Sequence, residues 1–279
     1  MCQGISFIDT TMPRFSPYIV SIALLAILTV LPAGSSISQV RDRWKLDCIV
    51  IDPGHGGKDP GTIGVTGVKE KHIVLKIALK LGALIEEHLP GIKVVYTRKD
   101  DRFIELYKRG KIANEAKGKL FVSIHCNSLE QKPSKTHGFE VYLLRPGRTD
   151  EAIRIAEVEN SVVRLEEDYE ERYKELDEEA FILINMAQSA YAKHSEKFAA
   201  LLSRRAELSP KMKNLGVKQA GFYVLVGASM PAVLVESGFL SNTKEEKFLS
   251  SDLGQSHIAY LLYYGIKDFV KYYEEHLNE

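Results

Sequence analysis

The sequence is poor in cysteine, with only three among 279 residues. Cys2, Cys48 and Cys126 are scattered and form no C-x-x-C pair, so they support neither a disulfide framework nor a structural zinc knot. A chain of this length can bury one substantial hydrophobic core without cross-links. The cysteine content therefore does not decide between an oxidising and a reducing compartment.

Several compact functional motifs are also missing. The sequence has no G-x-G-x-x-G or P-loop signature for phosphate binding, no G-x-S-x-G turn and no H-E-x-x-H pair. Charge of neither sign is in excess, because 37 basic residues balance 37 acidic ones, and nothing in the net charge indicates nucleic-acid binding. The balance is uneven along the chain, since residues 151–179 hold 12 acidic and 4 basic side chains.

The apolar run near the N-terminus covers 14 residues, 18–31, which is short for a membrane span of about 20. Arg14 precedes the run, and small residues follow at 32–38. A basic residue before a short apolar core, with small residues suited to signal-peptidase cleavage after it, predicts a secretory signal in residues 1–38. This signal implies export to the periplasm or cell envelope. Cleavage is favoured over retention as an anchor, and a buried helix is the simpler alternative.

Residues 39–45 form a polar linker. After it, short apolar runs typical of buried strands alternate with stretches whose apolar residues recur every three or four positions, as in amphipathic helices. The following ranges are expected to be strands: 46–51, 92–97, 120–124, 139–144, 222–226 and 232–236. The following ranges are expected to be helices: 70–89, 103–116 and 251–275. This alternation predicts an α/β domain over residues 46–275, with a mostly parallel sheet covered on both faces.

The pattern changes between residues 145 and 218. Apolar residues there recur mostly every three or four positions, at Ile155, Val158, Val162, Leu165, Tyr169 and Leu176. This spacing predicts an acidic amphipathic helix, and a second helical stretch is expected over residues 179–206. We interpret residues 149–208 as an all-helical insertion in the α/β domain.

Four residues stand where predicted strands end or a helix begins. His55 follows the first strand, His125 follows the third, and Glu236 ends the last, while Glu70 opens the first helix. Ligands of parallel sheets bind beyond the carboxyl ends of the strands, so these side chains can converge. Two imidazoles, one carboxylate and an open position form a catalytic zinc site, at which the pKa of bound water falls to about 7.

This reasoning predicts that His55, Glu70 and His125 bind the metal and that Glu236 moves protons as a base and acid. Each residue has a simpler alternative. A histidine after a strand is often only a hydrogen-bonding partner within the fold. A glutamate at the start of a helix is commonly explained by the helix dipole.

The sequence around these residues helps to decide between the catalytic and the structural interpretation. Four motifs occur in order at residues 50–61, 67–71, 123–128 and 234–242. Together they resemble the zinc-dependent N-acetylmuramoyl-L-alanine amidases of the third domain type, over residues 46–270. The resemblance implies a mixed sheet of about six strands, one zinc ion held by His55, Glu70 and His125, and Glu236 as the catalytic carboxylate. It also implies cleavage of the peptidoglycan amide between the lactyl group of N-acetylmuramic acid and L-alanine, in wall remodelling or daughter-cell separation.

Further residues are expected to act around this site. Arg109 lies in a segment that also resembles the family and could bind a peptide carboxylate or brace its helix; Asn127 is a second candidate for substrate binding. Cys126 stands where the family often has Ala or Val. Because neighbouring residues of an extended segment point to opposite faces, its thiol should face away from His125.

The predicted insertion resembles, in position and helicity, an element that covers and inhibits the active site in division-associated members of the family. We therefore hypothesise that Glu159, or with lower preference Glu157, occupies the open metal position until an activator protein withdraws it. The alternative is a solvated acidic face. Two other functions stay open from the residues alone: a zinc peptidase that cuts the stem peptide, and a wall-binding module without catalysis.

Overall fold

The computed structural model describes residues 45–147, 149–167, 169–173 and 189–276, which belong to one compact unit, Lys45–Glu279. The predicted signal at residues 1–38 lies outside the described residues. Among the residues that are described, no helix combines the length and apolar character needed to cross a membrane.

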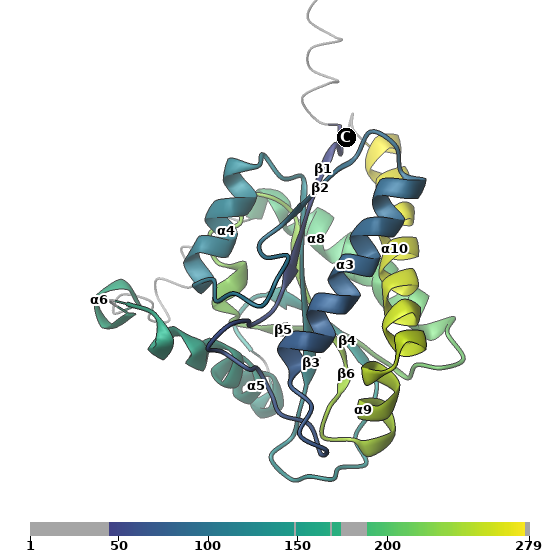
Figure 1. The fold of residues 1–279 in the computed structure, drawn as a ribbon. Helices are drawn as coiled ribbons and strands as arrows, with labels where there is room; N and C mark the ends of the chain where they lie inside the picture. Colours follow the sequence, from purple (N-terminus) through teal and green to yellow (C-terminus); the bar gives the residue numbers. More distant parts are fainter. Residues whose placement is uncertain (1–44, 148, 168, 174–188, 277–279) are drawn as a thin grey trace, which may run out of the picture. The chain divides into compact units, whose positions relative to one another are not determined.

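Six strands form one mixed sheet in the order β2-β1-β3-β6-β4-β5 (Figure 1). Their bounds are β1 (Cys48–Pro53), β2 (Lys93–Tyr96), β3 (Leu120–Asn127), β4 (Phe139–Leu144), β5 (Asn214–Ala220) and β6 (Ala232–Phe239). All neighbours pair in parallel except β4 and β6, which are antiparallel. The expected α/β fold with a mixed six-stranded sheet is confirmed.

The three central strands β1, β3 and β6 are buried along their whole length, because helices cover both faces of the sheet. On one face, the main core joins α3 (Glu70–His88), α8 (Ser189–Glu207) and α10 (Asp252–Glu275), with α9 (Thr243–Ser250) packing at its end. The other face carries α4 (Leu106–Glu115), α5 (Asp150–Asn160) and the 3-10 turns η1 (Ser161–Leu165) and η2 (Tyr223–Leu225).

One predicted strand was wrong. Residues 222–226 form the short η2 turn, and the strand that precedes β6 in the sequence is β5, at Asn214–Ala220. β5 lies at the edge of the sheet and is only partly buried, so polar residues such as Lys218 and Gln219 are accommodated and no apolar run reveals it. The apolar side chains of Phe222 and Leu225 are buried instead in the core beside α4.

The predicted insertion divides between the two faces of the sheet. Phe198 and Leu202 of α8 lie in the main core and α8 packs along α10, so this helix is an integral part of the domain. The remaining described residues of the insertion are 149–167 and 169–173, which contain α5, η1 and α6 (Tyr169–Tyr173). Residues 174–188 lie outside the described part. We use "the insertion" below for residues 149–173.

Candidate metal centre

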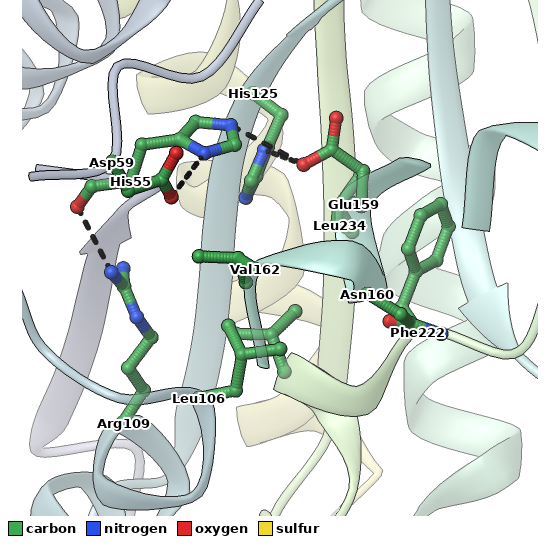
Figure 2. Close-up of a pocket in the computed structure, with 11 residues that line it drawn as sticks. His55, Asp59, Leu106, Arg109, His125, Glu159, Asn160, Val162, Phe222 and Leu234 are labelled. Carbon is green, nitrogen blue, oxygen red and sulfur yellow. Dashed lines mark hydrogen bonds and ion pairs between the residues drawn. The ribbon is translucent and has the colours of Figure 1, made fainter. Parts of the chain in front are cut away.

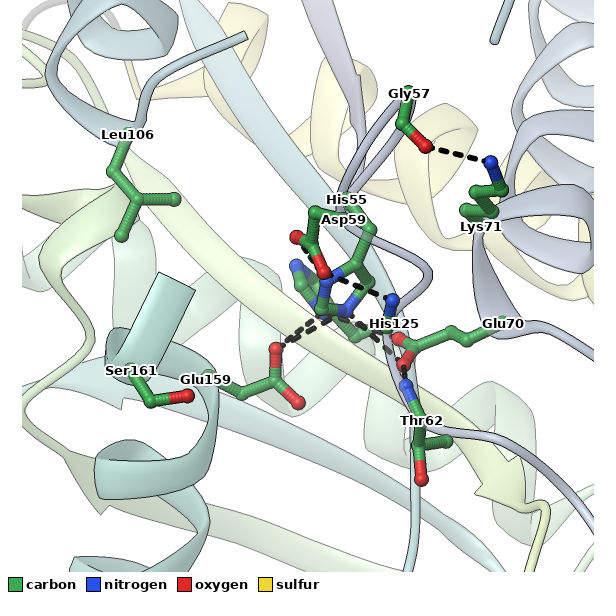
Figure 3. Close-up of polar contacts among 12 residues, drawn as sticks. His55, Gly57, Asp59, Thr62, Glu70, Lys71, Leu106, His125, Glu159 and Ser161 are labelled. Carbon is green, nitrogen blue, oxygen red and sulfur yellow. Dashed lines mark hydrogen bonds and ion pairs between the residues drawn. The ribbon is translucent and has the colours of Figure 1, made fainter. Parts of the chain in front are cut away.

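The three predicted metal ligands meet at the carboxyl ends of β1 and β3, and Glu159 of α5 joins them. One ligand atom from each of His55, Glu70, His125 and Glu159 lies within 4.8 Å of the others. His55 Nε2 lies 3.0 Å from a Glu70 oxygen and 3.2 Å from Glu159 Oε2. His125 Nδ1 lies 3.2 Å from Glu70 and 3.0 Å from that same Glu159 oxygen (Figure 3).

The loop after β1 is bent sharply to bring His55 into this group. His55 itself has a φ of 60°, a left-handed conformation that is rare outside glycine and concentrated at functional sites. Gly61 is also left-handed, and a Cβ there would stand 2.6 Å from a Glu70 oxygen and from the His55 ring. The glycine-rich sequence is therefore required for the close approach of loop and ligands.

Hydrogen bonds fix the direction of the ligand side chains. Asp59 Oδ2 contacts His55 Nδ1 at 2.7 Å, so the other ring nitrogen faces the cluster. Glu70 accepts one backbone hydrogen bond at each oxygen, from Thr62 and from Cys126, both at 2.8 Å. Sequence reasoning missed Asp59, although a carboxylate four residues after the histidine in the same loop was the available signal.

The four side chains form a buried group of opposite charges. Burial lowers the pKa of His125, but Glu159 and Glu70 outweigh it and raise the pKa to about 9. The pKa of His55 is raised well above its usual range in the same way, with burial outweighed by Glu70 and Glu159. Burial alone would raise the pKa of Glu159, yet the two histidines hold it below its ordinary value.

This group fits a divalent cation. His55 Nε2, His125 Nδ1 and Glu159 Oε2 are buried without a hydrogen bond of good geometry in the described structure. Tetrahedral zinc with bonds of about 2.0–2.1 Å sets neighbouring ligand atoms about 3.3 Å apart, close to the separations seen between these atoms. Two imidazoles and a carboxylate are a recognised catalytic zinc donor set, to which Glu159 adds a fourth donor atom, a second carboxylate oxygen.

Glu236 lies beside the cluster without belonging to it. In the sheet register it pairs with His125 of β3 on one side and with Glu140 of β4 on the other. Its side chain is completely buried, and neither carboxylate oxygen has a hydrogen-bond partner in the described structure. Burial raises its pKa well above the usual range, and Glu159 and Glu70 add to the effect. This carboxylate is therefore free to bind a proton.

Asn127 is held by a second buried carboxylate that sequence reasoning missed. Its Nδ2 donates to Glu140 at 3.0 Å, and Glu140 also accepts from the Tyr142 hydroxyl at 2.8 Å and from Lys218 Nζ at 2.6 Å. The amide oxygen of Asn127 accepts from the backbone of Ser128 at 2.7 Å. Both ends of the amide are thus fixed, and Glu140, which holds one of them, is the register partner of Glu236 in β6. A role in substrate binding stays a prediction.

Arg109 is buried under the metal loop, with 1% of its surface exposed. Its guanidinium donates to Asp52 at 2.8 Å. It also donates to the backbone oxygen of His55 at 2.9 Å (Figure 2). Burial raises the pKa of Asp52, but Arg109 and two hydroxyl groups outweigh it and lower the pKa. These contacts show Arg109 as a brace of the loop. The structure gives no direct support to its predicted role in substrate binding.

We expect Arg109→Met to lower the free energy of unfolding by about 3–5 kcal/mol, because Asp52 would remain buried without its partner. Denaturant titration followed by circular dichroism measures the change. Arg102→Met is the matched control, since Arg102 pairs with Asp100 at an exposed position and should contribute under about 1 kcal/mol. Equal effects of the two substitutions would contradict the bracing role.

An open groove reaches the cluster beside α5. It has a volume of about 390 Å³ and is lined on one side by the metal loop, including His55 and Thr62, and on the other by Val158, Glu159 and Arg164 of the insertion. The groove therefore runs between the metal loop and the insertion and reaches the metal group at His55 and Glu159.

Comparison with known proteins agrees with this geometry. The family model described as N-acetylmuramoyl-L-alanine amidase matches residues 49–268. The amidase AmiA of Escherichia coli K12 is 32% identical over 231 residues, covering 81% of this chain and 77% of AmiA. The AmiC amidase of E. coli O6:H1 is 35% identical over 224 residues, and the match covers 79% of this chain but only 52% of AmiC.

A solved structure shares the fold as well. The amidase CwlD of Clostridioides difficile, determined in complex with the GerS lipoprotein, superposes with a TM-score of 0.59 and 28% identity over 81% of this chain and 99% of CwlD. The family match covers the strands and helix that position His55, Glu70, His125 and Glu236. The chain therefore belongs to the N-acetylmuramoyl-L-alanine amidase family.

Proposed function

We propose that this chain is a zinc-dependent amidase that separates L-alanine from the lactyl group of N-acetylmuramic acid in peptidoglycan, and that α5 restrains it. The observation that carries the proposal is the buried group of two histidines and Glu70 with the unpartnered carboxylate of Glu236 beside it. This donor set suits a divalent cation, and Glu236 offers a proton-accepting side chain beside it.

The roles of the residues follow from amide chemistry. When bound, zinc would polarise the scissile carbonyl and make water a stronger acid. His55, Glu70 and His125 would hold it, with Asp59 orienting the first of these. Glu236 would accept the proton of the attacking water and donate it to the departing amine of L-alanine, because an amide nitrogen is a poor leaving group until it is protonated.

Glu159 would keep the site inactive by occupying the position that water or substrate needs. Its oxygen lies 3.2 Å from His55 and 3.0 Å from His125, whereas Glu157 is exposed on the same helix. The adjacent Asn160 supports this placement. Its side chain donates to the backbone oxygen of Gly221 at 2.8 Å and accepts from the backbone of Tyr223 at 2.9 Å.

Two further proposals concern the setting of the enzyme. CwlD is a relative that has been solved with a lipoprotein partner, and we propose a protein activator here that binds the insertion and withdraws Glu159. Because peptidoglycan lies outside the cytoplasmic membrane, the signal-like residues 1–38 support export to the periplasm or cell envelope.

The bond that is cut identifies the reaction. Purified peptidoglycan treated with the zinc-loaded protein should release intact stem peptides that begin with L-alanine, leaving glycan without peptide. Mass spectrometry of the products distinguishes this outcome from the alternatives. Stem peptides cut internally would indicate the peptidase, and unchanged material that retains the protein would indicate a wall-binding module.

Removal of the metal should abolish this activity. We expect treatment with EDTA to lower turnover to background and stoichiometric zinc to restore it, because Glu236 alone cannot activate water for amide cleavage. His55→Ala should lower the bound zinc below one per chain, as measured by inductively coupled plasma mass spectrometry. His257→Ala is the control, since His257 contacts Ser209 outside the site. Full zinc content in His55→Ala would contradict the ligand assignment.

We expect Asn160→Ala to raise basal activity about threefold to tenfold, because two hydrogen bonds that hold the end of α5 would be lost. Asn114→Ala is a closely matched control. Asn114 makes the same pair of contacts, to Gly227 and Ser229, at a site away from α5. Initial rates on purified cell wall test the difference, and equal rates for the two variants would argue against a positioning role of Asn160.

A further inference from the structure

A second pocket lies apart from the metal groove, on the other face of the sheet. It has a volume of about 750 Å³, within the range of small-ligand sites. Lys135, Lys211 and Lys244 line it together with Phe248 of α9 and Leu253 of α10. We call this the basic pocket.

The three lysines of the basic pocket are not neutralised. In the part of the chain that the structure describes, none of their ammonium groups has an ion-pair or hydrogen-bond partner. The carboxylate that lines the pocket, Glu245, accepts instead from the backbone of Phe239 at 2.7 Å and of Gly138 at 2.9 Å. The pocket therefore presents an excess of positive charge that suits an anionic ligand.

The pocket also offers apolar surface next to these charges. Phe248 is half-buried, and Leu253 is 64% exposed although it is a large aliphatic residue. A ligand that fits must combine carboxylates or other anions with short aliphatic groups. A peptidoglycan stem peptide has this composition, because it carries free carboxylates on alanyl, glutamyl and longer residues with methyl and methylene groups between them.

The position of the pocket links it to the catalytic edge of the sheet. The loop of residues 128–138 begins where β3 leaves the metal site and ends beside the pocket. Ser134 ties this loop to the start of α9, through its nitrogen to Ser241 at 2.7 Å and through its oxygen from Asn242 at 3.1 Å. α9 packs on the main core and α5 on the opposite face (Figure 1), so the basic pocket and the insertion lie on different faces of the sheet.

We propose that the basic pocket is a second, non-catalytic binding site for a carboxylate-bearing stem peptide of peptidoglycan. The identity of the polymer rests on the proposed function, whereas the anionic ligand class rests on the pocket itself. By holding a neighbouring stem through its carboxylates, the pocket raises the affinity for polymeric wall. It contributes nothing to the hydrolysis of a substrate that has a single stem.

The test compares two substrates with one triple variant, Lys135→Ala/Lys211→Ala/Lys244→Ala, in the zinc-loaded full chain. On soluble polymeric glycan that carries many stems, KM should rise about tenfold at low salt with kcat unchanged, since each exposed ammonium contributes modestly. On a disaccharide with one stem, both constants should equal those of the unmodified protein. A control triple variant at the exposed Lys111, Lys247 and Lys267 should behave like the unmodified protein on both substrates.

Amidation of the stem carboxylates provides the chemical control. On amidated polymer the triple variant and the unmodified protein should have the same KM, because the lysines no longer have a charged partner. Equal KM values on the untreated polymer would overturn the proposal. So would a lysine-dependent loss of binding to vesicles of anionic phospholipid with KM unchanged, which would assign the pocket to a membrane surface. Failure to cut the one-stem substrate would instead refute the proposed function.

Discussion

Replacement of Glu236 by glutamine is expected to lower turnover on peptidoglycan by about 10²- to 10⁴-fold, the contribution usual for a group that moves protons in the transition state. The bound zinc should stay at one per chain, because Glu236 is outside the group of four ligand atoms. Product mass spectrometry gives the rate, and metal analysis of the same sample gives the occupancy. Zinc retained together with full activity would remove Glu236 from the mechanism.

The same substitution should raise stability in the presence of EDTA. Glu236 is buried with no hydrogen-bond partner, and burial raises its pKa, so its charged form costs free energy in the folded protein. Glutamine removes that charge, and we expect a rise in Tm. Glu246→Gln is the matched control: Glu246 is also buried but accepts hydrogen bonds from Thr66, so this variant should lose stability and keep its activity. A lower Tm for Glu236→Gln would contradict our description of its environment.

Glu159→Gln is expected to raise basal activity about 10- to 100-fold, which corresponds to the loss of one charge-assisted contact of about 1.5–3 kcal/mol. In the proposed restraint, Glu159, which lies 3.2 Å from His55 and 3.0 Å from His125, competes with water and substrate for the metal site. Initial rates without any activator measure the effect. Glu157→Gln on the same helix is the control, because Glu157 is exposed and should change nothing.

A deletion tests the same restraint without relying on one side chain. Removal of residues 151–177 should also raise basal activity on purified cell wall. Lower activity in both Glu159→Gln and the deletion would show that Glu159 assists catalysis. Unchanged activity in both would show that the insertion has no regulatory role and is only a solvated acidic surface. Agreement between the two variants is needed, because the deletion also removes buried residues such as Ile155 and Val163.

Much of the site was readable from the sequence because its ligands stand at strand ends. His55 and His125 follow short apolar runs that read as buried strands, the family resemblance favoured them as ligands, and the parallel pairing of β1 with β3 brings them to one edge. Cys126 faces the main core, as the alternation of side chains predicted.

The parts that could not be predicted depend on register. Glu140 lies next to Glu236 only because β4 runs antiparallel to β6 with these two residues opposite each other. The contact of Asn160 with the backbone of Gly221 and Tyr223 joins residues about 60 positions apart, and no periodic pattern in the sequence predicts it. β5 escaped prediction for a related reason, since a partly exposed edge strand needs no continuous apolar run.

The composition of α5 has a consequence for how an activator could work. The helix buries only Ala152, Ile155 and Ala156, whereas α10 buries large residues along its whole length. Lifting α5 thus exposes little apolar surface, and the folded domain loses few of its contacts. A partner that prefers the displaced helix by a few kcal/mol can then shift the population between closed and open forms, so an ordinary transient interface is enough to turn the enzyme on.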